Sequence, residues 1–212
     1  SQLREGEPEP DDKVTIVNIG WLSRSEIARQ IENISLFKPR VIGMDIIFAC
    51  EVLDPVSCPG AFDTLGTAAL SQAIRNAQNS GIKMVLSQKL LQTRALVERE
   101  GDTDVYDSIS HSVPEILNDS YEGYVNLTSD ATHQEDIKYC RELPPMVMVD
   151  GKPELAFSVK MAMLYDPDKT SAFLMRGNET ETINFRGNTP DLYEASSYSG
   201  RYQFLDAEQA LD

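Results

Sequence analysis

Apolar positions in the first part of the chain switch between the periodicity of strands and that of helices. Residues 13–19, KVTIVNI, are rich in β-branched side chains and predict a strand. A helix is predicted next, because apolar residues recur there at i, i+4 and i+7: Ile27, Ile31 and Ile34. Ser23 and Glu26 have the spacing of a capping box at its start, and Pro39 lies beyond its end.

The same alternation continues through the next elements. Residues 41–48, VIGMDIIF, are apolar on both faces, which is typical of a parallel strand that helices cover on both sides. A second helix is predicted within 66–81, with Gly81 after its end and an apolar stripe of Leu70, Ala73, Ile74 and Ala77. Residues 82–86, IKMVL, predict a third strand. This order indicates an α/β fold with a β-α-β-α-β start, right-handed crossovers and a central, mostly parallel sheet with helices on both faces.

The second half of the chain is less regular. Residues 92–120 are rich in polar and charged side chains, and they predict a long excursion with a short helix. The elements expected after it are a strand that runs into a turn at 124–130, a strand at 146–149, a tight turn at Asp150-Gly151, a helix within 154–166 and a strand at 181–188. The apolar side of that helix would consist of Leu155, Val159, Ala162 and Met163.

Asp45 interrupts the apolar run 41–48. A bare carboxylate in a dry core costs several kcal/mol unless it is paired or hydrogen-bonded. Asp45 is therefore either a buried anchor that holds the loop around residues 18–23, or a group at a strand end that faces a ligand. Since residues 46–48 continue the run, the sequence favours the anchor.

Composition narrows the range of partners. The chain has 212 residues, enough for one sizeable domain, which we expect over 13–212 after a disordered, polar leader at 1–12. Its formal net charge of −15 argues against nucleic acid and against anionic lipid headgroups, because both favour a basic face. The sequence has no signal peptide and no apolar stretch of the roughly 18–20 residues that span a membrane. We expect a soluble fragment of a longer protein.

Cysteine and histidine are scarce. Cys50 and Cys58 flank a short loop, where they are either a disulfide, which would indicate an oxidising compartment, or two ordinary thiols, and Cys140 would stay unpaired. A set that contains His133 and Cys140, together with Glu135 and Asp136, matches no common zinc spacing. Nucleotide-binding glycine motifs and a G-x-S-x-G nucleophile elbow are missing. We therefore expect no metal, no cofactor and no catalysis.

Several blocks of sequence occur in an order that resembles a known family. They are DKVTIVNIG, a serine-bearing helix start, KPRVIGMDIIF, an acidic loop, a helix, IKMVLS, GYVNLTSD, Arg141, PELAFSVKMAMLY, INFRGN and a late aromatic-Leu-Asp stretch. This ordered set covers nearly all of 12–206 and is similar to the CHASE2 domain. The family pattern also has a Lys-Ile-Val-Leu-Val-Gly-like strand after the stretch that resembles FLDAEQALD. The sequence lacks that strand, so we expect a CHASE2-like domain that is truncated at its C-terminal end.

The resemblance implies an extracytoplasmic (periplasmic) sensory domain of a bacterial inner-membrane signalling protein. Membrane helices and a cytoplasmic output module would follow it, and the signal would be a small molecule or a protein whose identity the resemblance leaves open. Two alternatives stand beside this reading. One is a soluble α/β hydrolase-type enzyme that uses Asp45 or Asp130. The other is a ligand-free interaction module that forms a homodimer.

A sensory site would be built from loops at the carboxyl edge of the sheet, where ligands of open α/β folds bind. Ser23 and Arg24 begin a helix after the first strand, and backbone N–H groups at such a position suit an anion. Together with Asp45, the later candidates are Asn126, Asp130 and Arg141. For each of them, capping, turn formation or a surface ion pair is the competing interpretation.

Overall fold

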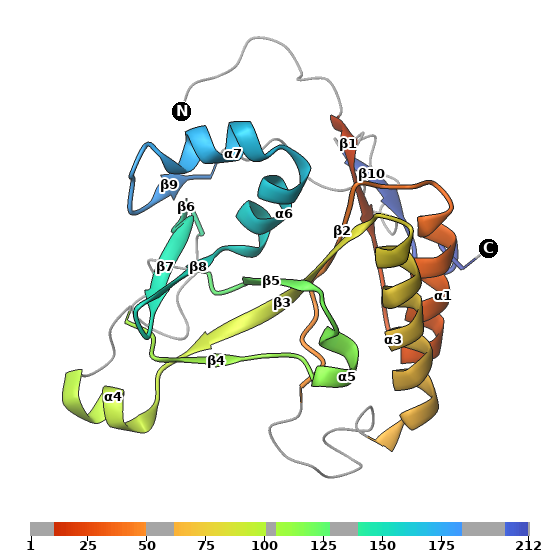
Figure 1. The fold of residues 1–212 in the computed structure, drawn as a ribbon, viewed down its shortest axis with the longest axis horizontal. Coiled ribbons are helices and arrows are strands. Elements are labelled where there is room, and N and C mark those ends of the chain that lie inside the picture. Colours follow the sequence, from red (N-terminus) through yellow and green to blue (C-terminus); the bar gives the residue numbers. More distant parts are fainter. Residues whose placement is uncertain (1–10, 50–61, 101–104, 128–139, 184–201, 212) are drawn as a thin grey trace, which may run out of the picture. The chain divides into compact units, whose positions relative to one another are not determined.

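The protein is described by a computed structural model that covers residues 11–49, 62–100, 105–127, 140–183 and 202–211 (Figure 1). The chain divides into two compact units. The smaller consists of Ser1–Leu22 with Asn184–Asp212, and the larger of Ser23–Ile183.

The smaller unit contains a pair of parallel strands. The predicted first strand is present as β1 (Asp11–Val17), and its partner is β10 (Tyr202–Leu205), which the sequence analysis did not identify. Side chains reinforce the pairing, since Asn18 Nδ2 donates to Asp206 Oδ1 at 3.0 Å. Residues 11 and 12 belong to β1, so the leader predicted over 1–12 does not include them, and residues 1–10 lie outside the described residues.

The larger unit is built on a parallel sheet with β3 (Lys83–Leu91) at its centre. On one side β3 pairs with β2 (Val41–Met44), and on the other with β5 (Tyr121–Tyr124). Beyond the end of β2, the last residues of β3 pair with the antiparallel strand β4 (Ser108–Ser110). This mixture of a parallel sheet with helices confirms the predicted fold class.

Two helices of this unit form where the sequence predicts them. Helix α1 (Arg24–Ser35) begins with the expected capping box of Ser23 and Glu26, and it packs against α3 (Thr64–Asn79). The predicted stripe of α3 is buried throughout: Leu70, Ala73, Ile74 and Ala77. After α3, Gly81 adopts a φ of +87°, which lets the next N–H, that of Ile82, bond back to Ala77 O at 3.1 Å.

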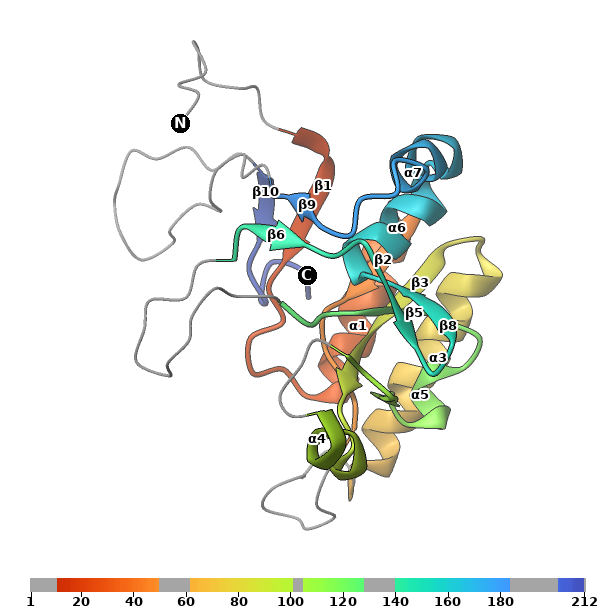
Figure 2. The ribbon, with the colours of Figure 1, turned by 90° about the vertical axis from the view of Figure 1, so that its left-hand side faces the viewer.

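Helices lie on both faces of the sheet (Figures 1 and 2). One face carries α6 (Phe157–Tyr165), and glycines at Gly43 and Gly123 let this helix approach β2 and β5 closely. Because side chains alternate along a strand, Met84 and Leu86 of β3 point to the opposite face, where α3 packs. Both side chains have no measurable exposure, so the centre of the core lies between β3 and α3.

The second half confirms some predictions and corrects others. The hairpin of β7 (Met146–Val149) and β8 (Lys152–Leu155) turns at Asp150-Gly151 as expected, with positive φ at both residues. Leu155 is therefore in a strand, and the predicted helix begins only at Phe157. The remaining described elements are α4 (Arg94–Glu100), α5 (Pro114–Leu117), α7 (Pro167–Leu174) and the strand pair β6 (Glu142–Leu143) with β9 (Glu181–Thr182).

Candidate functional site

Asp45 lies at the end of a strand and not inside one. Strand β2 ends at Met44, so the strand predicted over 41–48 is four residues too long and Asp45 is the first residue beyond it. Its side chain is exposed, which corrects the expectation of a buried carboxylate. Ser87 Oγ on β3 lies 3.0 Å from Asp45 Oδ1 and 3.1 Å from Met44 O, so the carboxylate is held against the sheet from its exposed position.

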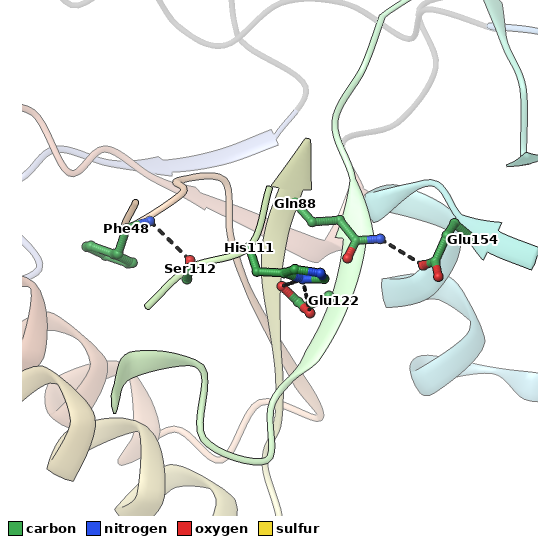
Figure 3. A network of polar contacts seen from close by, with 6 residues as sticks. All are labelled: Phe48, Gln88, His111, Ser112, Glu122 and Glu154. Carbon is green, nitrogen blue, oxygen red and sulfur yellow. Dashed lines mark hydrogen bonds and ion pairs between the residues drawn. The ribbon is translucent and has the colours of Figure 1, made fainter. Parts of the chain in front are cut away.

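Phe48 joins three parts of the larger unit. It is 5% exposed, its N–H donates to Ser112 Oγ at 3.0 Å, and its carbonyl accepts from Val113 N–H at 2.9 Å (Figure 3). On its other side, the Arg24 guanidinium carbon lies 5.6 Å from the centre of the phenyl ring, within the range of a cation–π contact. The segment after β2, the start of α1 and the link between β4 and α5 therefore meet at this ring.

Arg24 is partly buried at the start of α1. Its Nη1 donates to Thr67 Oγ1 of α3 at 2.5 Å, and this is its one hydrogen bond within the described part of the chain. Burial lowers the pKa of Arg24, and the nearby Asp63, which caps α3, opposes that change. A guanidinium has five N–H donors, and the contact with Thr67 uses one of them among the described residues. We call Arg24, Asp45, Phe48 and Thr67 the carboxyl edge, since they follow β2 or begin the helices beside it.

Ser23 serves as the cap of α1. Its Oγ accepts from the Glu26 N–H at 3.3 Å, while Glu26 Oε2 accepts from the Ser23 N–H at 2.7 Å. Hydrogen bonds from Ser23 to its carboxylate lower the pKa of Glu26. For this residue the capping interpretation is the one that the contacts support.

A second polar cluster lies beside the carboxyl edge and crosses three strands. His111 Nδ1 lies 2.8 and 3.0 Å from the two carboxylate oxygens of Glu122 on β5. Gln88, which is 1% exposed, donates to Glu154 Oε2 of β8 at 2.8 Å. In Figure 3 the His111 ring lies between the Phe48–Ser112 pair and the Gln88–Glu154 pair.

Asn126 is a structural residue. Its Oδ1 accepts from the Leu90 N–H at 2.8 Å and its Nδ2 donates to the Leu90 carbonyl at 3.0 Å. The side chain thus continues the ladder between β5 and β3 after β5 has ended. Both polar atoms of the side chain make these hydrogen bonds, which favours the structural interpretation of Asn126.

We expect Asn126→Ala to lower the free energy of unfolding by about 1–3 kcal/mol, because it leaves two buried backbone groups of Leu90 unpaired. Asn126→Asp keeps the acceptor but places a charged carboxylate oxygen against the Leu90 carbonyl, so it should also destabilise the protein. Urea denaturation of the two variants, with Leu127→Ala as a control at an exposed neighbour, measures the difference. Equal stability of Asn126→Ala and the wild type would contradict this role.

Of the remaining predicted positions, the structure describes only Arg141. Arg141 is exposed before β6, and its carbonyl accepts from the Ile183 N–H at 2.8 Å. Asp130 lies outside the described residues, as does the predicted Cys50–Cys58 pair, so the disulfide stays a prediction. Within the described ranges there is no cluster of three or more metal-binding side chains, and no helix there is long and apolar enough to cross a bilayer.

Sequence reasoning missed the residues on which both clusters depend. Phe48 was assigned to a strand because the apolar run continues through it, and Ser87 and Glu122 look like ordinary polar residues of their strands. His111 belongs to no recognisable sequence motif. Ser87 could have been found from its position in a strand, because it belongs to a run of five consecutive buried residues.

The sequence profile of the CHASE2 domain matches residues 11–208, nearly the whole chain. The chain belongs to the CHASE2 family. CHASE2 domains are extracytoplasmic and sensory, and they occur in signal-transduction proteins. No curated protein and no solved structure is significantly similar to the chain. In this CHASE2 domain, the carboxyl edge and the His111–Glu122 cluster are two of the polar clusters that the described residues of the larger unit form.

Proposed function

We propose that this CHASE2 domain is the input domain of a membrane-anchored bacterial signalling protein and that it binds a small anionic ligand at the carboxyl edge. Membership of a sensory family supports the role, and the single observation that carries the ligand class is the partly buried Arg24 guanidinium. It lies where α1 and α3 begin, and the positive ends of two helix dipoles favour an anion at such a place.

The hydroxyl groups near the two clusters do not favour a hydrolase. A serine nucleophile must be reached by its substrate and activated by a neighbouring base. Ser87 is 1% exposed and is bonded to Asp45, and Ser112, next to His111, is 3% exposed and accepts from Phe48. Each hydroxyl is buried in a structural contact, which argues against either serine as a nucleophile.

The wider arrangement of the protein follows from the family role. Membrane helices joined to the domain would anchor it in the inner membrane with the domain in the periplasm. A cytoplasmic output module would receive the signal, either from one chain or from a homodimer. The ligand-free interaction module is the alternative that a binding experiment excludes or supports.

Arg24→Ala should weaken the binding of small anions at least roughly tenfold. A hydrogen bond to a charged group contributes about 1.5–3 kcal/mol, and 1.4 kcal/mol corresponds to a factor of ten. Calorimetric titration of the chain with inorganic phosphate and with succinate provides the affinities. Arg29→Ala is the matched control, because it removes the same charge from an exposed position of the same helix.

Unchanged affinity in Arg24→Ala would remove this residue from the site. Absence of binding by the wild-type chain to both anions at millimolar concentration would contradict the anionic ligand class and would favour the interaction module. Thermal melts of both variants establish whether each remains folded during the titration.

A further inference from the structure

The His111–Glu122 pair joins segments that are not neighbours in the sheet. His111 follows β4, which pairs with β3 on the same side as β2, whereas Glu122 belongs to β5 on the other side of β3. The other described salt bridges connect residues three to five positions apart in sequence. The Glu122 side chain is 16% exposed and that of His111 is 47% exposed, so the ring meets solvent while its partner is largely shielded.

The charge of an imidazole determines the strength of such a contact. A neutral ring donates Nδ1–H to the carboxylate, and the ring nitrogen Nε2 makes no hydrogen bond within the described residues. Protonation turns this contact into an ion pair with a charge-assisted hydrogen bond, which is shorter and stronger. Histidine is the side chain that ordinarily makes this change between about pH 5 and 8.

The residues next to His111 connect it to the carboxyl edge. Ser112 accepts from the Phe48 N–H, and Val113 N–H donates to the Phe48 carbonyl. The Arg24 guanidinium in turn lies over the Phe48 ring. A path of direct contacts therefore runs from the His111 ring through Ser112 and Phe48 to Arg24.

We propose that the pair of His111 and Glu122, here called the clasp, responds to protons. Through the clasp, a change in external pH would alter the surroundings of Phe48 and Arg24. This inference rests on the proposed sensory function and names the proton as one of its inputs. As the pH falls, the hydrogen bond of the clasp becomes shorter and stronger. This draws the segment after β4 towards β5 and changes the position of Phe48. Binding and protonation are reciprocal, so an anion at Arg24 would also change the protonation of His111.

The charged groups around the clasp come from several elements. Glu122 on β5 is the direct partner, and Glu154 on β8 accepts a hydrogen bond from Gln88, which lies on the other side of the His111 ring in Figure 3. Lys89 on β3 pairs in register with Ser110, the residue before His111, and its side chain is exposed.

The test follows the backbone amide of Phe48 in nuclear magnetic resonance spectra of the 212-residue chain between pH 8 and 5. We expect its resonance to move along a single sigmoid in the wild type. The movement should be lost in His111→Gln and in Glu122→Gln, and it should persist in His133→Gln, which removes the other histidine of the chain. If His111→Gln fails to fold, Glu122→Gln decides the result.

A Phe48 resonance that stays constant in the wild type would overturn the proposal. So would a resonance that moves in both clasp variants by as much as in the wild type. The two proposals fail separately. Anion binding without a His111-dependent movement overturns the clasp alone, whereas the movement without anion binding overturns the anionic ligand and leaves the clasp.

Discussion

Phe48→Ala is expected to lower the free energy of unfolding by about 3–5 kcal/mol, the usual cost of truncating a buried aromatic residue. The ring is 5% exposed and lies where α1, the segment after β2 and the β4–α5 link meet. Its removal leaves a cavity that these segments cannot fill together, because the backbone of residue 48 is bonded to Ser112 and Val113. Urea denaturation at pH 7 measures the loss.

Phe48→Leu is the matched variant. It keeps most of the apolar volume and both backbone hydrogen bonds, and it removes the ring that the Arg24 guanidinium covers. A partly exposed cation–π contact contributes about 0.5–1 kcal/mol. Phe48→Leu should therefore be much more stable than Phe48→Ala, although the guanidinium of Arg24 no longer has a ring beneath it. A loss below about 1 kcal/mol in Phe48→Ala would show that the ring does not join these segments.

Gly123→Ala should destabilise the domain by about 3 kcal/mol, the upper end of the cost of overpacking a core. A Cβ at this position would lie 2.6 Å from Phe157 Cα and 3.0 Å from Phe157 N. Both atoms belong to the backbone at the start of α6, so the helix must move away from β5 to make room. The absence of a side chain at residue 123 is thus what sets the distance between helix and sheet.

Gly43→Ala provides the comparison on the same helix. Its Cβ would meet Met161 Sδ, and it would lie 2.8 Å from Phe157 Cζ; both are side-chain atoms that can turn aside. We expect it to cost less than Gly123→Ala. Ser158→Ala, at an exposed position of α6, should change stability by no more than about 0.5 kcal/mol. Equal losses in the two glycine variants would contradict the distinction between backbone and side-chain clashes.

The fold could be predicted where a single element determines its own pattern. The capping box of Ser23 and Glu26 and the buried stripe of α3 depend on local spacing, and the turn at Asp150-Gly151 depends on local chemistry. Strand β10 and the end of β2 depend on partners distant in sequence. The run 41–48 stays apolar because Phe48 is buried by Arg24 and by the β4–α5 link, and not because the strand continues.

The site was predictable only in part, for the same reason. Arg24 was found because the start of a helix after a strand is a local signal, and Asp45 because a carboxylate in an apolar run is conspicuous. The pairing of His111 with Glu122 brings together segments from opposite sides of β3, and no spacing in the sequence records it. Asn126 shows the converse case, since its side chain replaces backbone hydrogen bonds that only the structure reveals.

We expect this CHASE2 domain to lie on the outer side of the cytoplasmic membrane. Cys140 is a partly exposed free thiol and provides a direct test. Intact cells that produce the natural protein would be treated with a membrane-impermeant maleimide, and mass spectrometry of the Cys140 peptide would give the modified fraction. We expect the same modification in intact and in permeabilised cells. Modification only after permeabilisation would place the domain in the cytoplasm and contradict an extracytoplasmic position.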